Sequence, residues 1–571
     1  MSNKPKWGDA LKDDVVWYSD GNSNKPKLLL AHRKILKFLS IHGFNSLKDS
    51  NDRRARYQLI QTEDLQIKAH NLDTIRTFIY EYFEDKPDEW WIDKEKYGVE
   101  IEHGLDMYWT KDEVLDYMFD NLKFKESMID MQVPIVMKKP YTYDTIPLMK
   151  DGTDEVFIPF MNKIIRVTAT SIDAIDYTDM KSSNSLIWET QKRPFNISVI
   201  DDERKIMDSH FAKFCRKATS PRVKPKNSVD DWRDGFQESA DILKSLMTSY
   251  GYMISNYNNP STPVCPVYID GDAEIGLEDG RNGKSFIMLQ SMQKWKQTVE
   301  ISGRSWNPTA NGCWGQVNID TKFICINDAR ENFQFEELYD RLSDGFEVKA
   351  LYSNKFTIPR DKKPKIGITT NYQIQTKGGS GRHRIHTTPF GAYWLNCLEE
   401  REQPSDKKHL GKMMFEHDFT HDDYNHFFNF GFRCIQSYLK YGLHRCDLTE
   451  QNKKAIIRKY EGSNNYGVVE WWIDLVANNK VDGLLVNGVR RTDLLDRFHK
   501  DFSEEECLAT KLLWGSNPDK FNKMLYGVTT DMGWDWNPHK ADKGDGMNKR
   551  KWIGETTKSG KQIQWVKINK D

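Results

Sequence analysis

Apolar positions recur at helical spacing through the first part of the chain. Segments such as LLLAHRKILKFLSIHGF and LDTIRTFIYEYFEDKPDEWW place apolar residues three and four positions apart, which predicts amphipathic helices. Further along, EVFIPFMNKIIRVTATSIDAIDYT alternates apolar and polar positions and is rich in Val, Ile and Thr, which predicts strands. We therefore expect a helix-rich region over 1–150 and a strand-rich segment over 151–225, which together form a mixed α+β N-terminal region.

A basic stretch with little apolar content, RKATSPRVKPKNSVDD, predicts a linker and a domain boundary near residue 225. The run GFQESADILKSLMTSYGYMIS follows with helical spacing, and we interpret about 230–260 as a helical collar. Short apolar runs joined by loops and helices then extend from about 264 to 395. This alternation of strands and helices predicts an α/β core over 226–395.

Helical patterns dominate again over 396–460, which we interpret as a helical extension. The last region, 461–571, holds the short helical segments VVEWWIDLVAN, RRTDLLDRFHKDF and SNPDKFNKMLYG. It closes with KRKWIGETTKSGKQIQWVKI, where the Ser559-Gly560 pair between two alternating runs predicts a hairpin. Helices followed by a basic hairpin are typical of a winged helix, so we expect a DNA-binding domain of that kind here.

Composition narrows the classes of protein that fit. The 571 residues carry a formal net charge of −1, so nucleic-acid binding would need local basic patches or several copies of one patch. The lysines near the start have no apolar run behind them, and no stretch has membrane-spanning length. Eight cysteines without a Cys-x-x-Cys pair argue against a zinc ribbon or a secreted disulfide framework. We expect a soluble cytoplasmic protein that does not contact membranes.

The stretch GLEDGRNGKS ends like a phosphate-binding loop, although Glu278 stands where the usual pattern has its first glycine. An apolar run precedes it and a helical run follows it, which is the arrangement that points backbone N–H groups at phosphates. Gly280 and Gly283 would let the backbone curl, Lys284 would reach the β and γ phosphates, and Ser285 would bind Mg²⁺. The alternative interpretation is a surface turn that ends at Gly283.

Two further apolar runs end in polar residues. The run in TKFICINDARENF ends in Asn327 and Asp328, and an ATPase of this kind needs a carboxylate there for the metal and the attacking water. The run in KPKIGITTNYQIQ ends in Thr370 and Asn371, whose amide could contact the γ-phosphate or the attacking water. Polar residues at such places also serve as ordinary turn residues.

Two basic segments complete the candidate chemistry. Arg382 and Arg384 in GGSGRHRIHTTPF could act as an arginine finger in the site of a neighbouring subunit. The segment DGFEVKALYSNKFTIPRDKKPK predicts two strands, with Lys349, Lys355 and Arg360 at their turn or edge, which suits contact with a nucleic-acid backbone. Solvated surface residues are the alternative in both segments.

In this order, the segments GRNGKS, the run ending in Asn-Asp-Ala, LYDRLSDGFEVKALYSNKFTIP, and KIGITTN followed by RHR resemble motifs A, B, B′ and C and the arginine finger of superfamily 3 helicases. The resemblance is closest to the helicase part of poxvirus-type primase-helicases and of related phage and mobile-element replication proteins. It extends over roughly 150–571 and is closest over 264–392.

The resemblance implies an AAA+-like P-loop ATPase core with an α/β fold and a winged-helix tail. It also implies ATP and Mg²⁺ as cofactors, single-stranded DNA as a partner, and a homo-oligomeric ring, usually a hexamer, with sites between subunits. Other replication proteins would be further partners. The roles carried over by position are nucleotide binding (Gly280, Asn282, Gly283, Lys284, Ser285), catalysis (Lys284, Asp328, Asn371, Arg384 or Arg382), Mg²⁺ (Ser285, Asp328, with Asn327 as a further candidate) and DNA binding (Lys349, Lys355, Arg360).

This sequence departs from the family pattern at two positions. Motif B normally has two adjacent acids, but the first position here is Asn327, which lacks charge and puts the strength of Mg²⁺ binding in question. Glu278 replaces only the outer glycine of motif A, and we expect its carboxylate to point away from the phosphates, which would repel it.

The function that follows is an ATP-dependent replicative DNA helicase of a phage or mobile element, acting in the cytoplasm of a bacterial host. One alternative is a fused primase-helicase with primer synthesis in the N-terminal half, where WIDKEKYGVEIEHG brings Glu100, Glu102 and His103 together without an Asp-x-Asp pair. Another is a DNA-binding initiator or scaffold that uses ATP only to assemble, since Asn327 could weaken hydrolysis.

Overall fold

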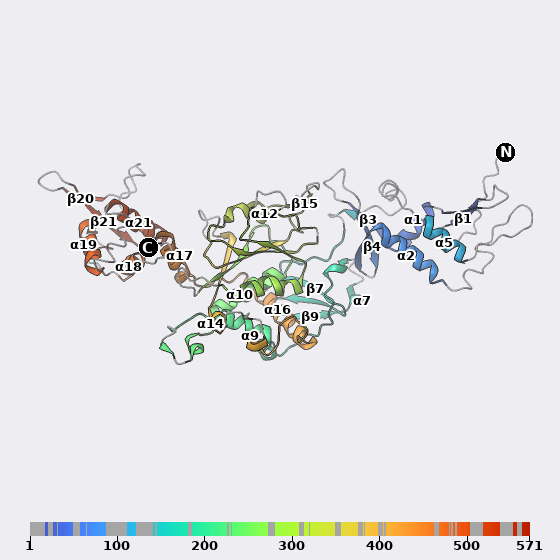
Figure 1. The fold of residues 1–571 in the computed structure, drawn as a ribbon, viewed down its shortest axis with the longest axis horizontal. Helices are drawn as coiled ribbons and strands as arrows, with labels where there is room; N and C mark the ends of the chain where they lie inside the picture. Colours follow the sequence, from blue (N-terminus) through green and yellow to red (C-terminus); the bar gives the residue numbers. More distant parts are fainter. Residues whose placement is uncertain are drawn as a thin grey trace, which may run out of the picture. The chain divides into compact units, whose positions relative to one another are not determined.

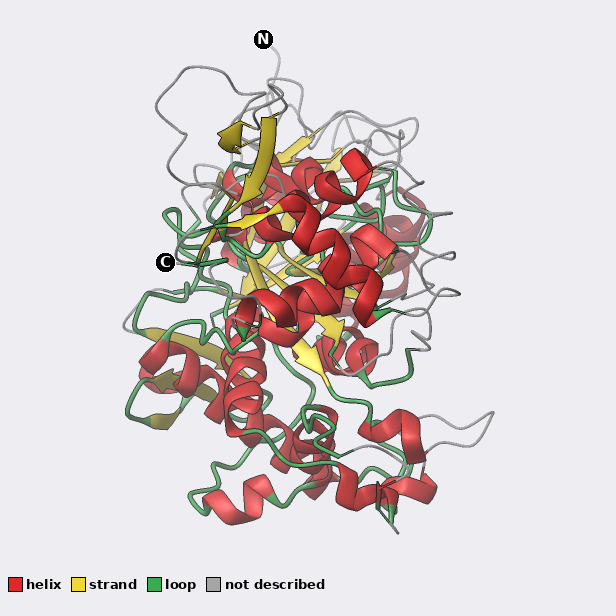
Figure 2. Ribbon diagram, turned by 90° about the vertical axis from the view of Figure 1, so that its left-hand side faces the viewer, coloured by secondary structure: helices red, strands yellow, loops and turns green. Residues whose placement is uncertain are grey.

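The structure is a computed structural model, and the chain divides into two compact units, Met1–Val199 and Ile200–Asp571. The protein contains both helices and strands (Figure 2), and each unit has both, so it is a mixed α/β protein. The residues that the structure describes are 17–20, 27–30, 32–48, 58–63, 65–86, 111–121, 141–142, 146–180, 185–224, 228–229, 231–271, 280–307, 313–318, 320–348, 356–374, 381, 383–397, 404, 407–461, 467–478, 480, 484–485, 488–502, 518–536, 552–556 and 562–570.

The first unit contains a five-stranded sheet with the order β10-β5-β4-β3-β6. Its strands are short and come mostly from the region in which we expected helices, so 1–150 is more mixed than the helical pattern indicated. Alternation over five or six residues is too brief to stand out beside helical repeats. The elements are α1 (His32–Ile41), β3 (Phe44–Lys48), β4 (Gln58–Glu63), β5 (Gln66–His70), α2 (Leu72–Glu84), α5 (Lys111–Asn121), β6 (Tyr141–Thr142) and β10 (Ile187–Trp188).

Two smaller sheets complete the described strands of this unit. A two-stranded sheet pairs β1 (Trp17–Asp20) with β2 (Lys27–Leu30). The first part of the predicted strand-rich segment 151–225 forms an antiparallel sheet of β7 (Glu155–Pro159), β8 (Ile164–Thr168) and β9 (Ile172–Ile175), whereas its second part contains the helices α8 (Glu203–Met207) and α9 (His210–Ala218). The acidic residues proposed for primer synthesis, Glu100 and Glu102 with His103, lie outside the described residues.

The second unit is built on a parallel five-stranded sheet with the order β12-β13-β16-β11-β17. Three of these strands are buried at every position, and strands covered on both faces read as largely apolar runs without clear alternation. β13, β16 and β11 are adjacent in this order and run parallel, so their carboxyl ends lie side by side. The strands are β11 (Cys265–Asp270), β12 (Thr298–Ser302), β13 (Phe323–Ala329), β16 (Lys365–Thr370) and β17 (Ile385–Phe390).

Two long helices pack together beside this sheet, α10 (Ala240–Ile254) and α16 (His421–Tyr441) (Figure 1). Helix α10 confirms the helical run expected after the linker. It contacts the sheet through Ser249, whose hydroxyl lies 3.2 Å from the hydroxyl of Tyr268 on β11. The two helices cross closely at Gly251, where an added Cβ would lie 2.2 Å from the carbonyl oxygen of Cys434.

The boundary between the units lies at Val199/Ile200 rather than near residue 225, because the helix before the predicted linker belongs to the second core. This helix is α9 (His210–Ala218). Its Phe211 packs edge-on against Phe427 of α16, and its Phe214 stacks on Trp394 at 5.0 Å. The burial of these two aromatic rings attaches the helix to the second unit, although the stretch after it is basic and polar.

The C-terminal part combines helices with a three-stranded sheet of order β18-β21-β20. Its strands β20 (Trp552–Thr556) and β21 (Gln562–Val566) pair antiparallel, which confirms the predicted hairpin, although its turn lies outside the described residues. In chain order the other elements are α17 (Thr449–Glu461), α18 (Val468–Ala477), β18 (Val489–Arg490), α19 (Arg491–Asp501), α21 (Pro518–Asp531), and the antiparallel pair β19 (Asp535–Trp536) and β22 (Ile568–Asn569).

Within the described ranges, none of the helices combines the length and the apolar character that crossing a membrane would require.

The Gly251 crossing can be tested by adding one methyl group. We expect Gly251→Ala to destabilise the second unit by about 2 kcal/mol or more, because the Cβ would meet backbone rather than a movable side chain. Calorimetric melting of the full chain would measure the change. Gly235→Ala is the matched control, since its Cβ would have no heavy atom closer than 3.4 Å. Equal melting temperatures for the two variants would contradict the close crossing.

Candidate phosphate-binding site

The predicted phosphate loop connects β11 to a helix that starts at the loop's end. Gly280, Arg281 and Gly283 all have positive φ angles, of 72°, 53° and 87°, so the backbone turns in the left-handed region that favours glycine. At Gly283 a side chain would also collide with the ring of Phe214, 2.6 Å from the Cβ position. The helix begins as the π-helix η5 (Phe286–Gln290) and continues as α11 (Ser291–Trp295).

Glu278 lies in 272–279, outside the described residues, so its expected orientation stays a prediction.

Lys284 is buried and forms an ion pair with Asp270, the last residue of β11. Only 6% of the Lys284 side chain and 1% of the Asp270 side chain are exposed. Asn282 donates a second hydrogen bond to the same carboxylate oxygen, at 2.6 Å. The other oxygen of Asp270 and the amide oxygen of Asn282 are buried and have no hydrogen-bond partner among the described residues. Such buried unpaired acceptors mark a place that a donor or cation can satisfy.

Ser285 contacts the end of β13 through Asn327. The Ser285 hydroxyl donates to the amide oxygen of Asn327 at 2.6 Å, and the Thr369 hydroxyl donates to the same oxygen at 2.7 Å. The amide nitrogen of Asn327 donates to Glu300 at 2.8 Å, from the edge strand β12. This network joins the loop to β12, β13 and β16.

Asp328 takes a different direction from Asn327 because the strand is irregular there. Its φ of 59° and the register shift between Ile326 and Ala329 mark a bulge. The Asp328 carboxylate accepts a hydrogen bond from Arg304 at 2.5 Å. Asn327, and not Asp328, therefore contacts Ser285. Among the described contacts none joins Asp328 to Ser285, so the metal role of Asp328 stays a prediction.

Asn371 follows β16 and lies beside the loop. Its side-chain amide is 3.7 Å from the position that a Cβ on Gly280 would take. The three predicted segments therefore meet at one edge of the sheet, with the loop after β11, Asn327 on β13 and Asn371 after β16. Parallel strands with neighbouring carboxyl ends produce this convergence, which is the usual position of ligand sites in open α/β sheets.

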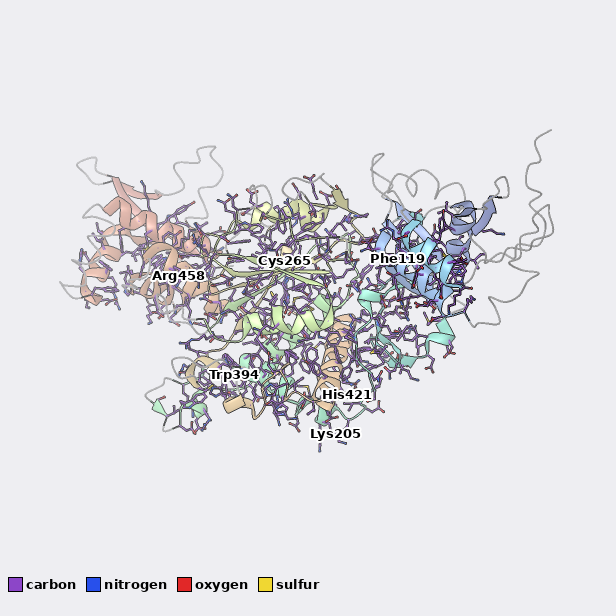
Figure 3. All side chains as sticks on the ribbon, turned by 45° about the vertical axis from the view of Figure 1, so that its right-hand side comes forward. Phe119, Lys205, Cys265, Trp394, His421 and Arg458 are labelled. Carbon is purple, nitrogen blue, oxygen red and sulfur yellow. The ribbon has the colours of Figure 1, made fainter. Side chains whose placement is uncertain are left out.

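Arg384 lies at the other edge of the same sheet, directly before β17. Its neighbour Ile385 is in register with Cys265, the first residue of β11, which Figure 3 labels. A six-residue strand spans roughly 20 Å, so Arg384 is far from the loop of its own chain. Its guanidinium lies over the ring of Tyr339 at 4.8 Å and donates to Ser343 at 3.3 Å. Arg382, Lys349 and Lys355 lie outside the described residues.

Both strands of the predicted basic hairpin are present. β14 (Phe346–Val348) and β15 (Phe356–Ile358) pair antiparallel, as expected. Arg360 follows in an exposed turn, where its guanidinium donates to the carbonyl of Pro260 at 2.5 Å.

The donor set fits Mg²⁺ together with phosphate. The Ser285 hydroxyl, the Asn327 amide oxygen and the Glu300 carboxylate are linked by hydrogen bonds, and all are the hard oxygen ligands that Mg²⁺ takes. Lys284 supplies a buried cation for phosphate oxygens. Buried acceptors on Asp270 and Asn282 add places for further donors.

Sequence reasoning missed several residues of this site. Asp270 is one of them, although its position at the end of the apolar run VCPVYID could have pointed to it. Glu300 lies on β12 and Arg304 follows that strand, and no prediction included β12. Helix α17 also reaches this edge, where Lys454 donates to the carbonyl of Gly271 at 3.1 Å. On the same helix Arg458, labelled in Figure 3, lies 4.8 Å from the ring centre of Tyr372.

Comparisons with known proteins give little beyond the sequence. No protein-family model matches the chain, and no curated protein matches it. Among solved structures, an A-form apo structure of the C-terminal region of NrS-1 has a TM-score of 0.39 and 9% identity, covering 94% of this chain and 99% of that one. Another apo structure of the NrS-1 C-terminal region has a TM-score of 0.36 and 11% identity, covering 94% and 98%. Similarity of this extent assigns neither a fold family nor a function to the chain.

The buried ion pair can be tested by a double-mutant cycle on stability. Asp270→Asn and Lys284→Met should each destabilise the second unit by about 3 kcal/mol, because each leaves the other group without its countercharge. The double variant should lose clearly less than the sum, as calorimetric melting would show. The half-exposed pair Lys163 and Asp176, 3.1 Å apart, is the control, and its cycle should give under about 1 kcal/mol. Additive losses at Asp270 and Lys284 would contradict the pairing.

Proposed function

We propose that this protein is an ATP-dependent DNA helicase that works as a homo-oligomeric ring. One observation carries the proposal: the phosphate loop, Asn327 and Asn371 come from three neighbouring strands and meet at one edge of a parallel sheet. These are the parts that phosphoryl transfer needs, namely a phosphate cradle, a metal-side polar pair and a residue near the γ-phosphate. The resemblance to superfamily 3 helicases in the same segments supports an AAA+-like core.

In this proposal the triphosphate occupies the loop, and Lys284 exchanges its contact with Asp270 for phosphate oxygens. The lysine charge stays paired in both arrangements, whereas Asp270 keeps only the Asn282 amide as a donor and loses its countercharge, so phosphate binding has to offset that cost. Ser285 and Asn327 would hold Mg²⁺ against the phosphates, with the carboxylate of Glu300 behind Asn327. The ion would neutralise charge on the phosphates when bound.

Asp328 is the proposed residue for orienting the attacking water. Its carboxylate is about two-fifths exposed, and Arg304 fixes one of its oxygens. The remaining oxygen can accept a proton or a hydrogen bond from water, and Asn371 beside Gly280 can do the same from the third strand. Positioning of this kind accounts for most of the catalysis in phosphoryl transfer.

The position of Arg384 favours an assembly of several copies. At the amino edge of the sheet it cannot reach the loop of its own chain, yet it is half-buried and stacked on Tyr339. A fixed arginine at that edge suits the finger role only in a neighbouring subunit's site. A ring would place each Arg384 at the next subunit's phosphates.

The C-terminal part supports a DNA contact. From α18 onward its elements follow the order helix, strand, helix, helix, short strand β19 (Asp535–Trp536) and hairpin, and β18 pairs with the hairpin strand β21. That order is the one expected for a winged helix, whose helices and wing contact duplex grooves or backbone.

A second candidate is an ATP-assembled DNA-binding scaffold with weak hydrolysis. The observation in its favour is that Asn327, which contacts Ser285, is uncharged. ATP turnover with and without single-stranded DNA separates the two candidates, because the scaffold would bind ATP and hydrolyse little. Primer synthesis by the N-terminal half stays a further alternative without a described site.

The decisive experiment mixes two inactive variants. Lys284→Ala should lose ATP binding, and Arg384→Ala should bind ATP but hydrolyse it at least about 10³-fold more slowly. Mixed in equal amounts, the variants should regain part of the DNA-stimulated turnover, because some interfaces combine an intact loop with an intact arginine. Lys213→Ala, an exposed change on α9, serves as the control. Turnover by Arg384→Ala alone at the normal rate, or no recovery on mixing while rings form, would contradict the shared site.

A further inference from the structure

Asp328 has a backbone conformation that residues other than glycine rarely adopt. Its φ of 59° lies in the left-handed region, and the register of β13 against β16 shifts between Ile326 and Ala329. A residue in this region costs free energy and persists only where its surroundings hold it. The contacts that hold Asp328 are therefore part of the site, because they decide where its carboxylate points.

One of these contacts comes from Thr369, near the end of β16. The backbone N–H of Asp328 donates to the Thr369 hydroxyl oxygen at 2.9 Å. A backbone N–H can only donate, so the hydroxyl is the acceptor here and its single proton is available for a second partner. That partner is the amide oxygen of Asn327, at 2.7 Å. One hydroxyl therefore binds two consecutive residues of β13, which the proposed function assigns to Mg²⁺ and to the attacking water.

The other hydrogen bonds of Asn327 agree with this direction of donation. Its amide nitrogen donates to the carboxylate of Glu300 at 2.8 Å, and an ionised carboxylate can only accept. The amide oxygen therefore lies on the opposite side, where it accepts from Thr369 and from the Ser285 hydroxyl. Asn327 thus presents its oxygen, and not its nitrogen, to Ser285, as the binding of a cation at that place requires.

Thr369 is a firm restraint because it is buried inside the sheet. It is 1% exposed and lies in register with Tyr268 on β11, and its β-branched side chain has few rotamers to choose from. The side chain of Asp328 has another contact, with Arg304, but those side chains are 39% and 73% exposed. An ion pair in such a position restrains its members only weakly. The hydroxyl of Thr369 is therefore the stronger of the two restraints on Asp328.

We propose that Thr369 is a positioning residue of the ATP site. Its hydroxyl keeps Asp328 in the left-handed conformation and keeps the amide oxygen of Asn327 turned towards Ser285. This inference rests on the proposed function, because it concerns the same site. Without the hydroxyl, the N–H of Asp328 loses its acceptor and the carboxylate loses the fixed direction that orienting a water requires.

The test compares variants of the full chain that separate the hydroxyl from the shape of the side chain. Thr369→Val removes the hydroxyl with little change of shape, and Thr369→Ser keeps the hydroxyl. Thr388→Val is the matched control, because Thr388 is also buried in this sheet and its hydroxyl lies 3.0 Å from that of Ser245. Calorimetric melting verifies folding, and Thr369→Ala, which also lacks the hydroxyl, replaces Thr369→Val if that variant is unfolded.

Two measurements follow the two residues that Thr369 holds. ATP turnover with single-stranded DNA is measured at saturating Mg²⁺, and ATP binding is measured by titration calorimetry with Mg²⁺ and with EDTA. We expect Thr369→Val to lower kcat by about tenfold or more and to change KM for ATP by no more than about threefold, because orientation of the water acts in the transition state. The gain in ATP affinity on adding Mg²⁺ should shrink by about threefold, the effect of one hydrogen bond.

Thr369→Ser and Thr388→Val should match the wild type in both measurements. A loss of kcat alone assigns the effect to Asp328, and a smaller gain from Mg²⁺ alone assigns it to Asn327. A folded Thr369→Val protein that equals the wild type in both would overturn the inference and leave the proposed function in place. Equal defects in Thr369→Ser and Thr369→Val would also overturn it, because packing and not the hydroxyl would then be responsible.

The wild type separates this inference from the proposed function. If it binds ATP without hydrolysing it, the proposed helicase function fails, and the calorimetric comparison of Thr369→Val with the wild type decides the inference. A wild-type protein that binds no ATP contradicts both.

Discussion

The candidate site depends on one constraint, which is that a nearly inaccessible lysine needs a countercharge. Lys284 is 5% exposed, and a cation in that position is stable only if an anion accompanies it. Asp270 supplies the anion from the end of β11, and Asn282 fixes the same carboxylate oxygen. Residues 280–285 of the loop are therefore held to the end of β11, and a phosphate that binds Lys284 has to compete with the Asp270 carboxylate.

The need for a countercharge applies also to the proposed Mg²⁺ ligands around Ser285. Asn327 stands where the superfamily 3 pattern that this sequence resembles has an acid, and it accepts hydrogen bonds from Ser285 and Thr369. A carboxylate is nevertheless present one strand away, since Glu300 accepts from the Asn327 amide. The bulge at Asp328 then turns the second acid towards Arg304. Negative charge around Ser285 is thus distributed over two strands instead of two consecutive residues.

The sequence predicted those parts of the structure that depend on residues close together in the chain. The runs that became β11, β13 and β16 are apolar because both of their faces are covered, and the glycines of the loop are required by positive φ angles. The sequence could not reveal that Asp270 pairs with Lys284, because a carboxylate at a strand end usually belongs to a turn. It missed β12, whose alternation over five residues is weak. It also set the unit boundary too late, since the burial of Phe211 and Phe214 depends on partners more than 170 residues away, such as Trp394.

The competition between Asp270 and phosphate is the central claim, and equilibrium ATP binding tests it most directly. Titration calorimetry of the full chain would compare the wild type with Asp270→Asn, and with Asp208→Asn as an exposed control. Removing the competing charge should tighten ATP binding by about tenfold in Asp270→Asn, even though that variant is less stable without ligand. Unchanged or weaker ATP binding by a folded Asp270→Asn protein would contradict the account.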